Sequence, residues 1–203
     1  MHHHHLDAII RGEYPSFFMT NFIEVYDNAL SSDQCQRIID YFESSDEKDR
    51  GVVGKGDIFK VDLSKKDSTD VILKFSYETE ITRMIHDVLY DATQKYSKKY
   101  KDSRKVSPWA PQNDFNIQRY YPGQGFKAIH CENNSKYDNT VLAWMFYLNT
   151  VEDGGTLFTS YDLVTDCVEG RLVLWPAYWT HCHRGITSNI KTKYIATGWT
   201  CYI

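Results

Sequence analysis

The sequence predicts a mostly β fold of the α+β class: a jelly-roll barrel with two N-terminal helices packed on it. After residue 109 the chain consists of short runs suited to strands, separated by turn signals at a spacing of roughly ten residues. Before that point, two segments place apolar residues at helical spacing. The 203 residues suffice for one domain with a substantial core. We therefore expect a single domain over residues 6–203.

The first helix is predicted to begin at Ser31, after a short strand within 22–30 that ends in a turn. Ser31 and Gln34 form a capping-box pattern, in which each side chain can bond the other residue's backbone N–H. The apolar residues that follow share one helical face, and the helix is expected to end near residues 44–45. A strand is expected at 58–63, a polar loop at 65–70, and a second, longer helix from about Glu78 to about Lys101.

The barrel strands are predicted from runs bounded by glycine, proline and asparagine. The run 140–148 is apolar on both faces and is expected to be central and buried. Trp109 is the aromatic residue most expected to be exposed, whereas Trp144, Trp175 and Trp179 are interpreted as core or rim packing residues. The expected strands are 114–121, 127–132, 140–148, 156–158, 171–175 and 193–202, with turns at 122–125, 153–155 and 169–170.

Composition limits the classes of partner. Residues 1–5, a methionine and four histidines, are interpreted as an expression-tag remnant and set aside. The formal net charge of -4 gives no reason to expect nucleic acid as a partner. No apolar run is long enough to span a bilayer, and no signal peptide is expected. We therefore expect neither nucleic-acid nor membrane binding.

The sequence has five cysteines, an odd number, and no C-x-x-C motif. This pattern favours reduced thiols, and hence a cytoplasmic protein, in the host cell if a phage encodes it. Cys131 and Cys182 each flank a candidate metal ligand. Strand alternation would point them away from the metal, so they are interpreted as small buried hydrophobic residues.

Four histidines remain outside the tag, and three of them fall in two clusters. His130 and Glu132 are two residues apart, so in an extended segment their side chains point to the same face. A second histidine from a distant strand, His181 or His183, would complete a two-histidine, one-carboxylate set. That set leaves open coordination positions and is typical of non-haem Fe(II) oxygenases. The alternative is scattered polar residues on an ordinary sandwich, and His86 is interpreted in that way.

Three blocks of the C-terminal half resemble, in order, the motifs of prolyl 4-hydroxylase-type 2-oxoglutarate dioxygenases. Residues 121–126 (YPGQGF) followed by H-x-E at 130–132 resemble Y-x-x-G-x-x-F…H-x-D. Residues 147–158 (YLNTVEDGGTLF) resemble Y-L-N…E-G-G-x-T-x-F. Residues 183–199 resemble a histidine followed ten residues later by [RK]-Y-x-x-T-x-W. The helix that opens at Ser31 is similar to the family's amino-terminal start, and the short phage-encoded members are the most similar.

This resemblance implies a cupin-like double-stranded β-helix that uses Fe(II), 2-oxoglutarate and O2, with ascorbate as a candidate reductant. His130, Glu132 and His183 would bind the iron. Lys193, ten residues after His183, would pair with the far carboxylate of 2-oxoglutarate, and these four residues form the expected catalytic set. The spacing to Lys193 favours His183 over His181. The chain departs from the family where Glu132 replaces the usual aspartate and where 187–188 replace a proline-valine pair.

The resemblance also implies four further residues for the 2-oxoglutarate pocket. Tyr121 and Tyr147 stand where hydroxyls commonly assist the far carboxylate. Thr197 and Trp199 share a strand face with Lys193 and would line the same pocket.

The implied reaction is hydroxylation of prolyl residues in a peptide or protein, coupled to decarboxylation of 2-oxoglutarate to succinate and CO2. Two alternatives remain open. One is a hydroxylase of a free amino acid or another small molecule. The other is a barrel that binds metal without catalysis. The sequence does not predict the oligomeric state.

Overall fold

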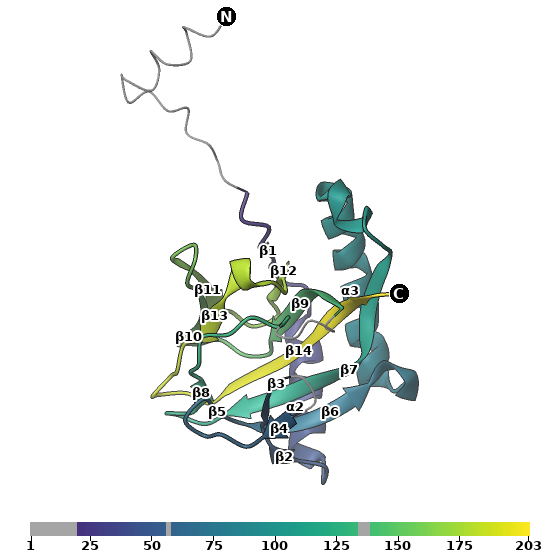
Figure 1. The fold of residues 1–203 in the computed structure, drawn as a ribbon. Coiled ribbons are helices and arrows are strands. Elements are labelled where there is room, and N and C mark those ends of the chain that lie inside the picture. Colours follow the sequence, from purple (N-terminus) through teal and green to yellow (C-terminus); the bar gives the residue numbers. More distant parts are fainter. Residues whose placement is uncertain (1–19, 56–57, 134–138) are drawn as a thin grey trace, which may run out of the picture.

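The computed structural model describes residues 20–55, 58–133 and 139–203, and within them two antiparallel sheets form the centre of the fold (Figure 1). The larger sheet has seven strands and the smaller has three, in the order β11-β10-β13. The smaller sheet comprises β11 (Leu163–Cys167), β10 (Val151–Phe158) and β13 (His183–Gly185). In spatial order the larger sheet comprises β1 (Glu24–Tyr26), β12 (Leu172–Pro176), β9 (Thr140–Tyr147), β14 (Lys193–Tyr202), β7 (Trp109–Tyr120), β6 (Thr69–Lys74) and β2 (Asp49–Arg50).

Two small strand pairs and a set of helices complete the described part of the chain. β3 (Val53–Lys55) pairs with β4 (Ile58–Lys60), and β5 (Lys66–Asp67) pairs with β8 (Gly125–Phe126). The α-helices are α2 (Ser32–Ser44) and α3 (Glu80–Lys99). Single 3-10 turns occupy η1 (Phe75–Tyr77), η2 (Lys101–Arg104) and η3 (Trp179–His181). The prediction of a mostly β fold with two helices is confirmed.

The larger sheet separates two hydrophobic cores. One face packs against the helices, where Ile38 and Phe42 of α2 and Ile85 and Leu89 of α3 are fully buried with Trp144 of β9. The other face packs against the smaller sheet through side chains that include Tyr120, Tyr147, Phe158, Trp175 and Ile195. Alternate residues of each central strand therefore face the helices and the smaller sheet, as the period of two requires. This explains why every residue of β9 is buried.

The two helices begin at side-chain caps that the sequence encodes. Ser31 Oγ accepts from the backbone N–H of Gln34, and Gln34 Oε1 accepts from the backbone N–H of Ser31, so the predicted capping box is confirmed.

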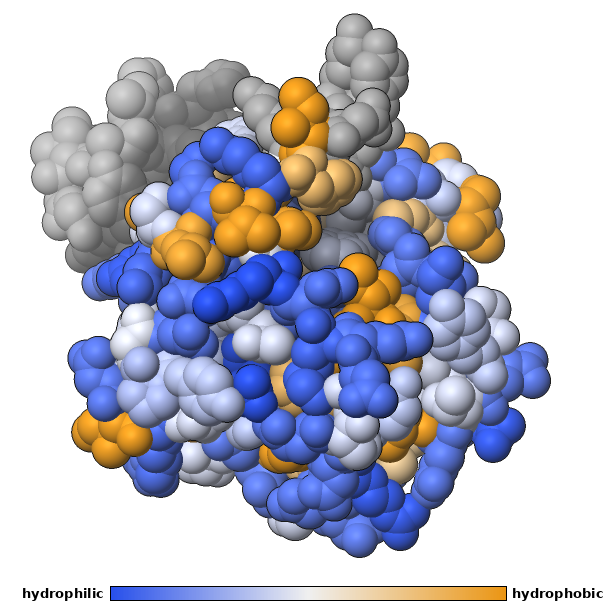
Figure 2. Space-filling view, turned by 90° about the horizontal axis from the view of Figure 1, so that it is seen from below, coloured by the Kyte–Doolittle hydropathy of each residue, from blue (hydrophilic) through white to orange (hydrophobic). Residues whose placement is uncertain are grey.

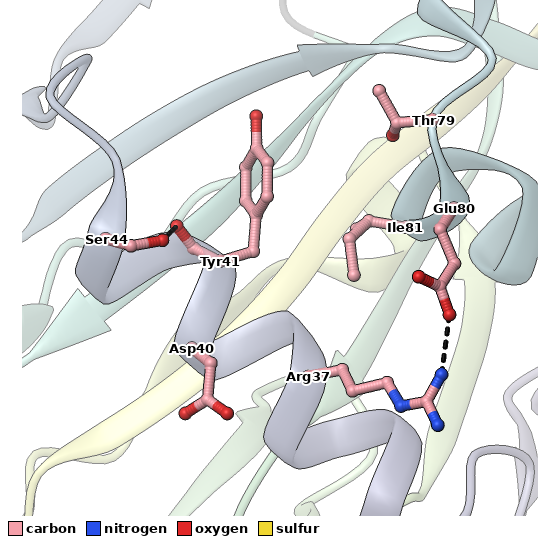
Figure 3. A pocket seen from close by; sticks show the side chains of 7 residues that line it. All are labelled: Arg37, Asp40, Tyr41, Ser44, Thr79, Glu80 and Ile81. Carbon is pink, nitrogen blue, oxygen red and sulfur yellow. Dashed lines mark hydrogen bonds and ion pairs between the residues drawn. The ribbon is translucent and has the colours of Figure 1, made fainter.

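Figure 3 shows the pocket where α2 approaches the start of α3, bridged by Arg37 and Glu80. These two side chains lie 2.5 Å apart but are more than half exposed, so the ion pair adds little stability.

The predicted polar loop at 65–70 is wrong, because two of its charged residues, Lys66 and Asp70, are buried in strands β5 and β6. Lys66 Nζ lies 2.6 Å from Asp70 Oδ2, and both side chains are almost fully buried. Ser68 Oγ donates to the other carboxylate oxygen at 2.7 Å, and Gln118 Nε2 donates to Oδ2 at 3.3 Å. The sequence reads as a solvated loop because the partner Gln118 comes from the distant strand β7.

Three other expectations about local structure are also wrong. The segment 127–132 is not a continuous strand, because after β8 only His130 forms a strand-like bridge. The predicted turn at 153–155 lies inside β10, which shifts register there against β11. Trp109 is buried rather than exposed, because β7 begins at this residue and its indole donates to Ser103 O at 2.9 Å under the Arg104 guanidinium.

The described surface is mainly polar. Figure 2 shows one face of the molecule, on which hydrophobic residues form separate clusters among hydrophilic ones. Scattered clusters of this kind are normal for a protein surface. In the residues that the structure describes, we find no helix whose length and apolar character would let it cross a membrane.

Candidate metal and 2-oxoglutarate site

His130 and His183 face each other directly across two antiparallel segments. Each backbone N–H donates to the other residue's carbonyl, at 3.0 Å and 2.8 Å. The two imidazole ring centres lie 4.4 Å apart. The backbone therefore fixes both histidines before any ligand binds.

Both imidazoles present the same nitrogen to the centre of the site. His130 Nδ1 lies 2.9 Å from Ala128 O, and His183 Nδ1 lies 2.9 Å from His181 O. A carbonyl oxygen can only accept a hydrogen bond, so each Nδ1 must carry a hydrogen, and Nε2 is the nitrogen that can bind a metal once it has lost any proton of its own. Such second hydrogen bonds commonly orient metal-binding histidines. Phe126 stacks on His130 with ring centres 3.8 Å apart, which further restricts that ring.

Glu132 completes the cluster. Its Oε1 lies 3.2 Å from His183 Nε2 and 3.6 Å from His130 Nε2. Ligand atoms of His130, Glu132 and His183 all lie within 4.8 Å of one another. Burial alone would raise the pKa of Glu132, but hydrogen bonds and charge from both histidines hold it well below its usual value. The carboxylate is thus anionic at neutral pH and, with two imidazole nitrogens, fits the donor set preferred by non-haem Fe(II).

His181, the other candidate from its cluster, does not join these three residues. It ends the 3-10 turn η3, and its Nε2 lies 2.7 Å from Asn21 O and 3.3 Å from Tyr161 OH. It borders a separate cavity of about 560 Å³ between the end of α3 and β12. His181 and His183 do not share one extended face, because η3 ends at His181 and β13 begins only at His183.

Lys193 is a buried cation between the two sheets. It is 5% exposed, and its Nζ donates to Gly154 O at 2.8 Å and Ile186 O at 3.0 Å. In the described ranges, no carboxylate lies within 4.0 Å of this ammonium. Burial lowers the pKa of Lys193, and the charges of Cys167 and Asp153 offset this only in part, so the charged form is incompletely compensated. An anionic ligand at this position would supply it.

The structure separates the other predicted pocket residues. Tyr147 lies between the two sheets, where its hydroxyl contacts Thr156 and Thr165. Thr197 faces the same side as Lys193, and its hydroxyl donates to Trp144 O at 2.8 Å. Trp199 lies beside the cluster of His130, Glu132 and His183, and its indole N–H donates to Glu132 Oε2 at 2.8 Å.

Tyr121 does not reach the site. It is 46% exposed and its ring packs against the Arg119 guanidinium, on the helix side of the sheet. The preceding residue, Tyr120, is buried and stands opposite Lys193 in the β7–β14 register, with Lys193 Nζ 5.4 Å from its ring centre. The sequence carried a signal for this residue, because the spacing Y-x-x-G-x-x-F through Gly123 and Phe126 begins at Tyr120.

Comparisons with known proteins agree with this geometry. Residues 115–201 match the family model for the 2OG-Fe(II) oxygenase superfamily. No curated protein sequence matches the chain significantly.

Solved structures share the fold at low sequence identity. A viral collagen prolyl hydroxylase from Paramecium bursaria Chlorella virus-1 matches with a TM-score of 0.61 and 18% identity, over 90% of this chain and 97% of the viral one. A Pseudomonas putida prolyl-4-hydroxylase gives 0.65 and 14%, over 91% and 94%. A Trichoplax adhaerens prolyl hydroxylase, in complex with a hypoxia inducible factor peptide fragment, gives 0.69 and 14%, over 90% and 84%. By fold and by motif, the chain therefore resembles the prolyl 4-hydroxylase type of 2OG-Fe(II) oxygenase, as its sequence indicated.

Proposed function

We propose that this chain is an Fe(II)- and 2-oxoglutarate-dependent dioxygenase that hydroxylates prolyl residues in a peptide or protein. The observation that carries the proposal is the convergence of His130 Nε2, His183 Nε2 and Glu132 Oε1 within one barrel that also contains the buried ammonium of Lys193. The three ligands support a bound metal ion. The buried lysine, with no carboxylate partner among the described residues, supports an anionic co-substrate.

The residues of the site would have separate roles in binding the metal and the co-substrate. His130, Glu132 and His183 would hold the iron from one side, which leaves its remaining positions open. Bound Fe(II) would supply the activation of O2 that couples oxidation of 2-oxoglutarate to hydroxylation of the substrate. Lys193 would hold the far carboxylate of 2-oxoglutarate, with Tyr120 beside it. Aromatic side chains of Phe126, Phe158 and Trp175 surround the histidines and would exclude water.

Glu132 replaces the aspartate of the usual motif, and Trp199 supports its use as a ligand. The longer side chain of glutamate has one more rotatable bond than aspartate, so fixing it as a ligand loses more conformational entropy unless a partner already holds it. The indole N–H of Trp199 takes Oε2 and leaves Oε1 toward the histidines. A glutamate therefore suits the site when this donor is present.

The peptide substrate is the finer part of the proposal. The Trichoplax neighbour is described in complex with a peptide, and the viral and bacterial neighbours are described as prolyl hydroxylases. These likenesses support a proline-containing peptide or protein as the substrate of this chain. Ascorbate is proposed as the reductant that keeps the iron ferrous.

A turnover assay tests the proposal. The purified chain would receive Fe(II), 2-oxoglutarate, ascorbate and O2 with either proline-containing peptides or free amino acids, and both succinate and hydroxylated product would be measured. We expect at least one proline-containing peptide to stimulate succinate formation and to gain one oxygen. Stimulation only by free amino acids would establish the small-molecule hydroxylase instead. No succinate above that of His183→Ala under any condition would leave a barrel without this catalysis.

A further inference from the structure

Two cysteines are adjacent in sequence to the two histidines of the candidate metal site. Cys131 follows His130, and Cys182 precedes His183. Since His130 and His183 exchange both backbone hydrogen bonds, the next opposed pair along these antiparallel segments is Cys131 and Cys182. That pair occupies a non-hydrogen-bonded position, where side chains approach each other most closely. The backbone register thus places the two thiols together.

The two thiols contact each other through a side-chain hydrogen bond and remain reachable. Each Sγ also donates to a nearby backbone carbonyl, Cys131 to Asn133 O at 3.3 Å and Cys182 to Trp179 O at 3.2 Å. Both cysteines are only partly buried, contrary to the expectation that they are small core residues. Cys35 and Cys167, by contrast, are buried. Cys201 is partly exposed, and its Sγ lies 3.4 Å from Gln112 Oε1.

We propose that Cys131 and Cys182 form a reversible disulfide, and that this bond weakens metal binding by the adjacent histidines. Oxidised glutathione, a small-molecule disulfide, is a sufficient oxidant. One cysteine attacks a glutathione sulfur and releases one reduced glutathione, and the second cysteine attacks the mixed disulfide and releases the other. The two thiol protons and two electrons pass to the two glutathione molecules, so one disulfide replaces another.

The effect on metal binding follows from backbone geometry. Opposed residues in a non-hydrogen-bonded pair have Cα atoms about 4.5 Å apart, at the short end of the range of about 4.4–6.8 Å found in disulfides, whose commonest separation is about 5.5–6 Å. A bond with the commonest geometry therefore widens the pair by about 1 Å. The imidazoles on the next residues move with it, although metal–ligand distances tolerate only about 0.2 Å. This coupling rests on the metal site of the proposed function, whereas the disulfide itself does not.

The first experiment maps the disulfide in the metal-free, full-length chain. The chain would be equilibrated anaerobically at a series of [GSH]²/[GSSG] values, quenched with acid, alkylated and digested. We expect two of the five thiols to disappear together, in one linked peptide pair that contains Cys131 and Cys182 and that dithiothreitol separates.

Matched variants make this map decisive. Cys201→Ser removes a thiol outside the pair and should leave the linkage unchanged. Cys131→Ser and Cys182→Ser should each abolish it. Five alkylated thiols at the most oxidising value, glutathione adducts without an internal link, or a link through another cysteine would overturn the proposal.

The second experiment measures the coupling without turnover. Mn(II) suits imidazole and carboxylate ligands and competes poorly for thiols, so it is the probe. We expect the linked chain to bind Mn(II) on the order of tenfold more weakly than the reduced chain. By linkage, saturating Mn(II) should lower the midpoint [GSH]²/[GSSG] by about the same factor.

Equal Mn(II) affinities for the linked and reduced chains would overturn the coupling. A reduced chain that binds no Mn(II) would overturn both the coupling and the proposed metal site. The disulfide map is obtained without metal, so it separates failure of the thiol pair from failure of the proposed function.

Discussion

The indole N–H of Trp199 donates a hydrogen bond of 2.8 Å to Glu132 Oε2, while Glu132 Oε1 faces His183 Nε2 at 3.2 Å. One carboxylate is thus shared between a fixed donor and the histidine cluster. Trp199 comes from β14, the strand that also carries Lys193. The same strand therefore orients a metal ligand at one end and places the buried ammonium at the other.

Replacing Trp199 with phenylalanine tests this relationship. Trp199→Phe keeps an aromatic ring but removes the donor, so Glu132 loses its fixed orientation. We expect Mn(II) affinity to fall by about 10- to 100-fold, the usual cost of losing such an outer hydrogen bond. Titration followed by water-proton relaxation measures it, and circular dichroism checks the fold.

Trp179→Phe is the matched control, because Trp179 is 76% exposed and lies outside the cluster. An unchanged Mn(II) affinity in Trp199→Phe would show that Glu132 needs no such support.

Lys193→Ala tests the anion-binding role. Removing the ammonium leaves the metal ligands intact, so Mn(II) affinity should stay within about twofold. The concentration of 2-oxoglutarate needed for half-maximal turnover should rise roughly 10- to 100-fold, which corresponds to a charge-assisted hydrogen bond worth about 1.5–3 kcal/mol. Lys191→Ala removes a half-exposed lysine paired with Glu152 and serves as the control. The same 2-oxoglutarate requirement in both variants would refute the role of Lys193.

The two histidines of the second cluster should behave differently. His183→Ala removes a ligand and should abolish both Mn(II) binding and 2-oxoglutarate turnover. His181→Ala removes hydrogen bonds to Asn21 O and Tyr161, and should leave a measurable fraction of both. Loss of Mn(II) binding in His181→Ala alone, with a folded protein, would reverse the assignment.

Metal binding should release a proton near neutral pH. Burial lowers the pKa of His130, but the hydrogen bond and charge of Glu132 outweigh this and raise it above the ordinary 6.5. Protonation of His130 therefore stabilises the metal-free fold. This contribution is fully present below pH 6.5 and is lost as the pH rises through the raised pKa of His130. A metal at Nε2 must displace that proton, so Mn(II) affinity should increase with pH in this window. Calorimetry in buffers of different ionisation enthalpy measures the release, and identical heats in all buffers would contradict it.

The buried pair of Lys66 and Asp70 should control stability. Asp70→Ala leaves an ammonium with 6% side-chain exposure unpaired, together with the Ser68 and Gln118 donors. We expect the free energy of unfolding to fall by about 3–5 kcal/mol. Urea denaturation measures it, with Asp102→Ala as the control because its pair with Lys105 is exposed. A loss below about 1 kcal/mol would show that the site accommodates the unpaired lysine.

Local patterns in the sequence were sufficient for several elements. The Ser31 capping box, the apolar run of β9 and the alternation of β14 each depend on neighbouring residues, and the structure confirms all three. His130, Glu132 and His183 were found by spacing and motif, and the structure brings them together.

The features that were predicted wrongly have different causes. The segment 65–70 reads as solvated because its compensating Gln118 is 48 residues from Asp70. Trp109 is buried by Ser103 and Arg104, which follow the second helix. The choice of Tyr121 over Tyr120 was an error of one position, and in a strand one position changes the face. Of these cases, only the choice of Tyr120 could have been made from local spacing, because the pattern Y-x-x-G-x-x-F begins at that residue.

An anaerobic titration of the reduced chain with Fe(II) and then 2-oxoglutarate tests the central claim most directly, because a 2-oxoglutarate chelate on such iron gives a weak absorbance in the visible region. We predict that this absorbance develops in the wild-type chain at one iron per chain, is absent in His183→Ala, and needs a higher 2-oxoglutarate concentration in Lys193→Ala. An absorbance that is missing from the wild-type chain, or unchanged in His183→Ala, would contradict the account.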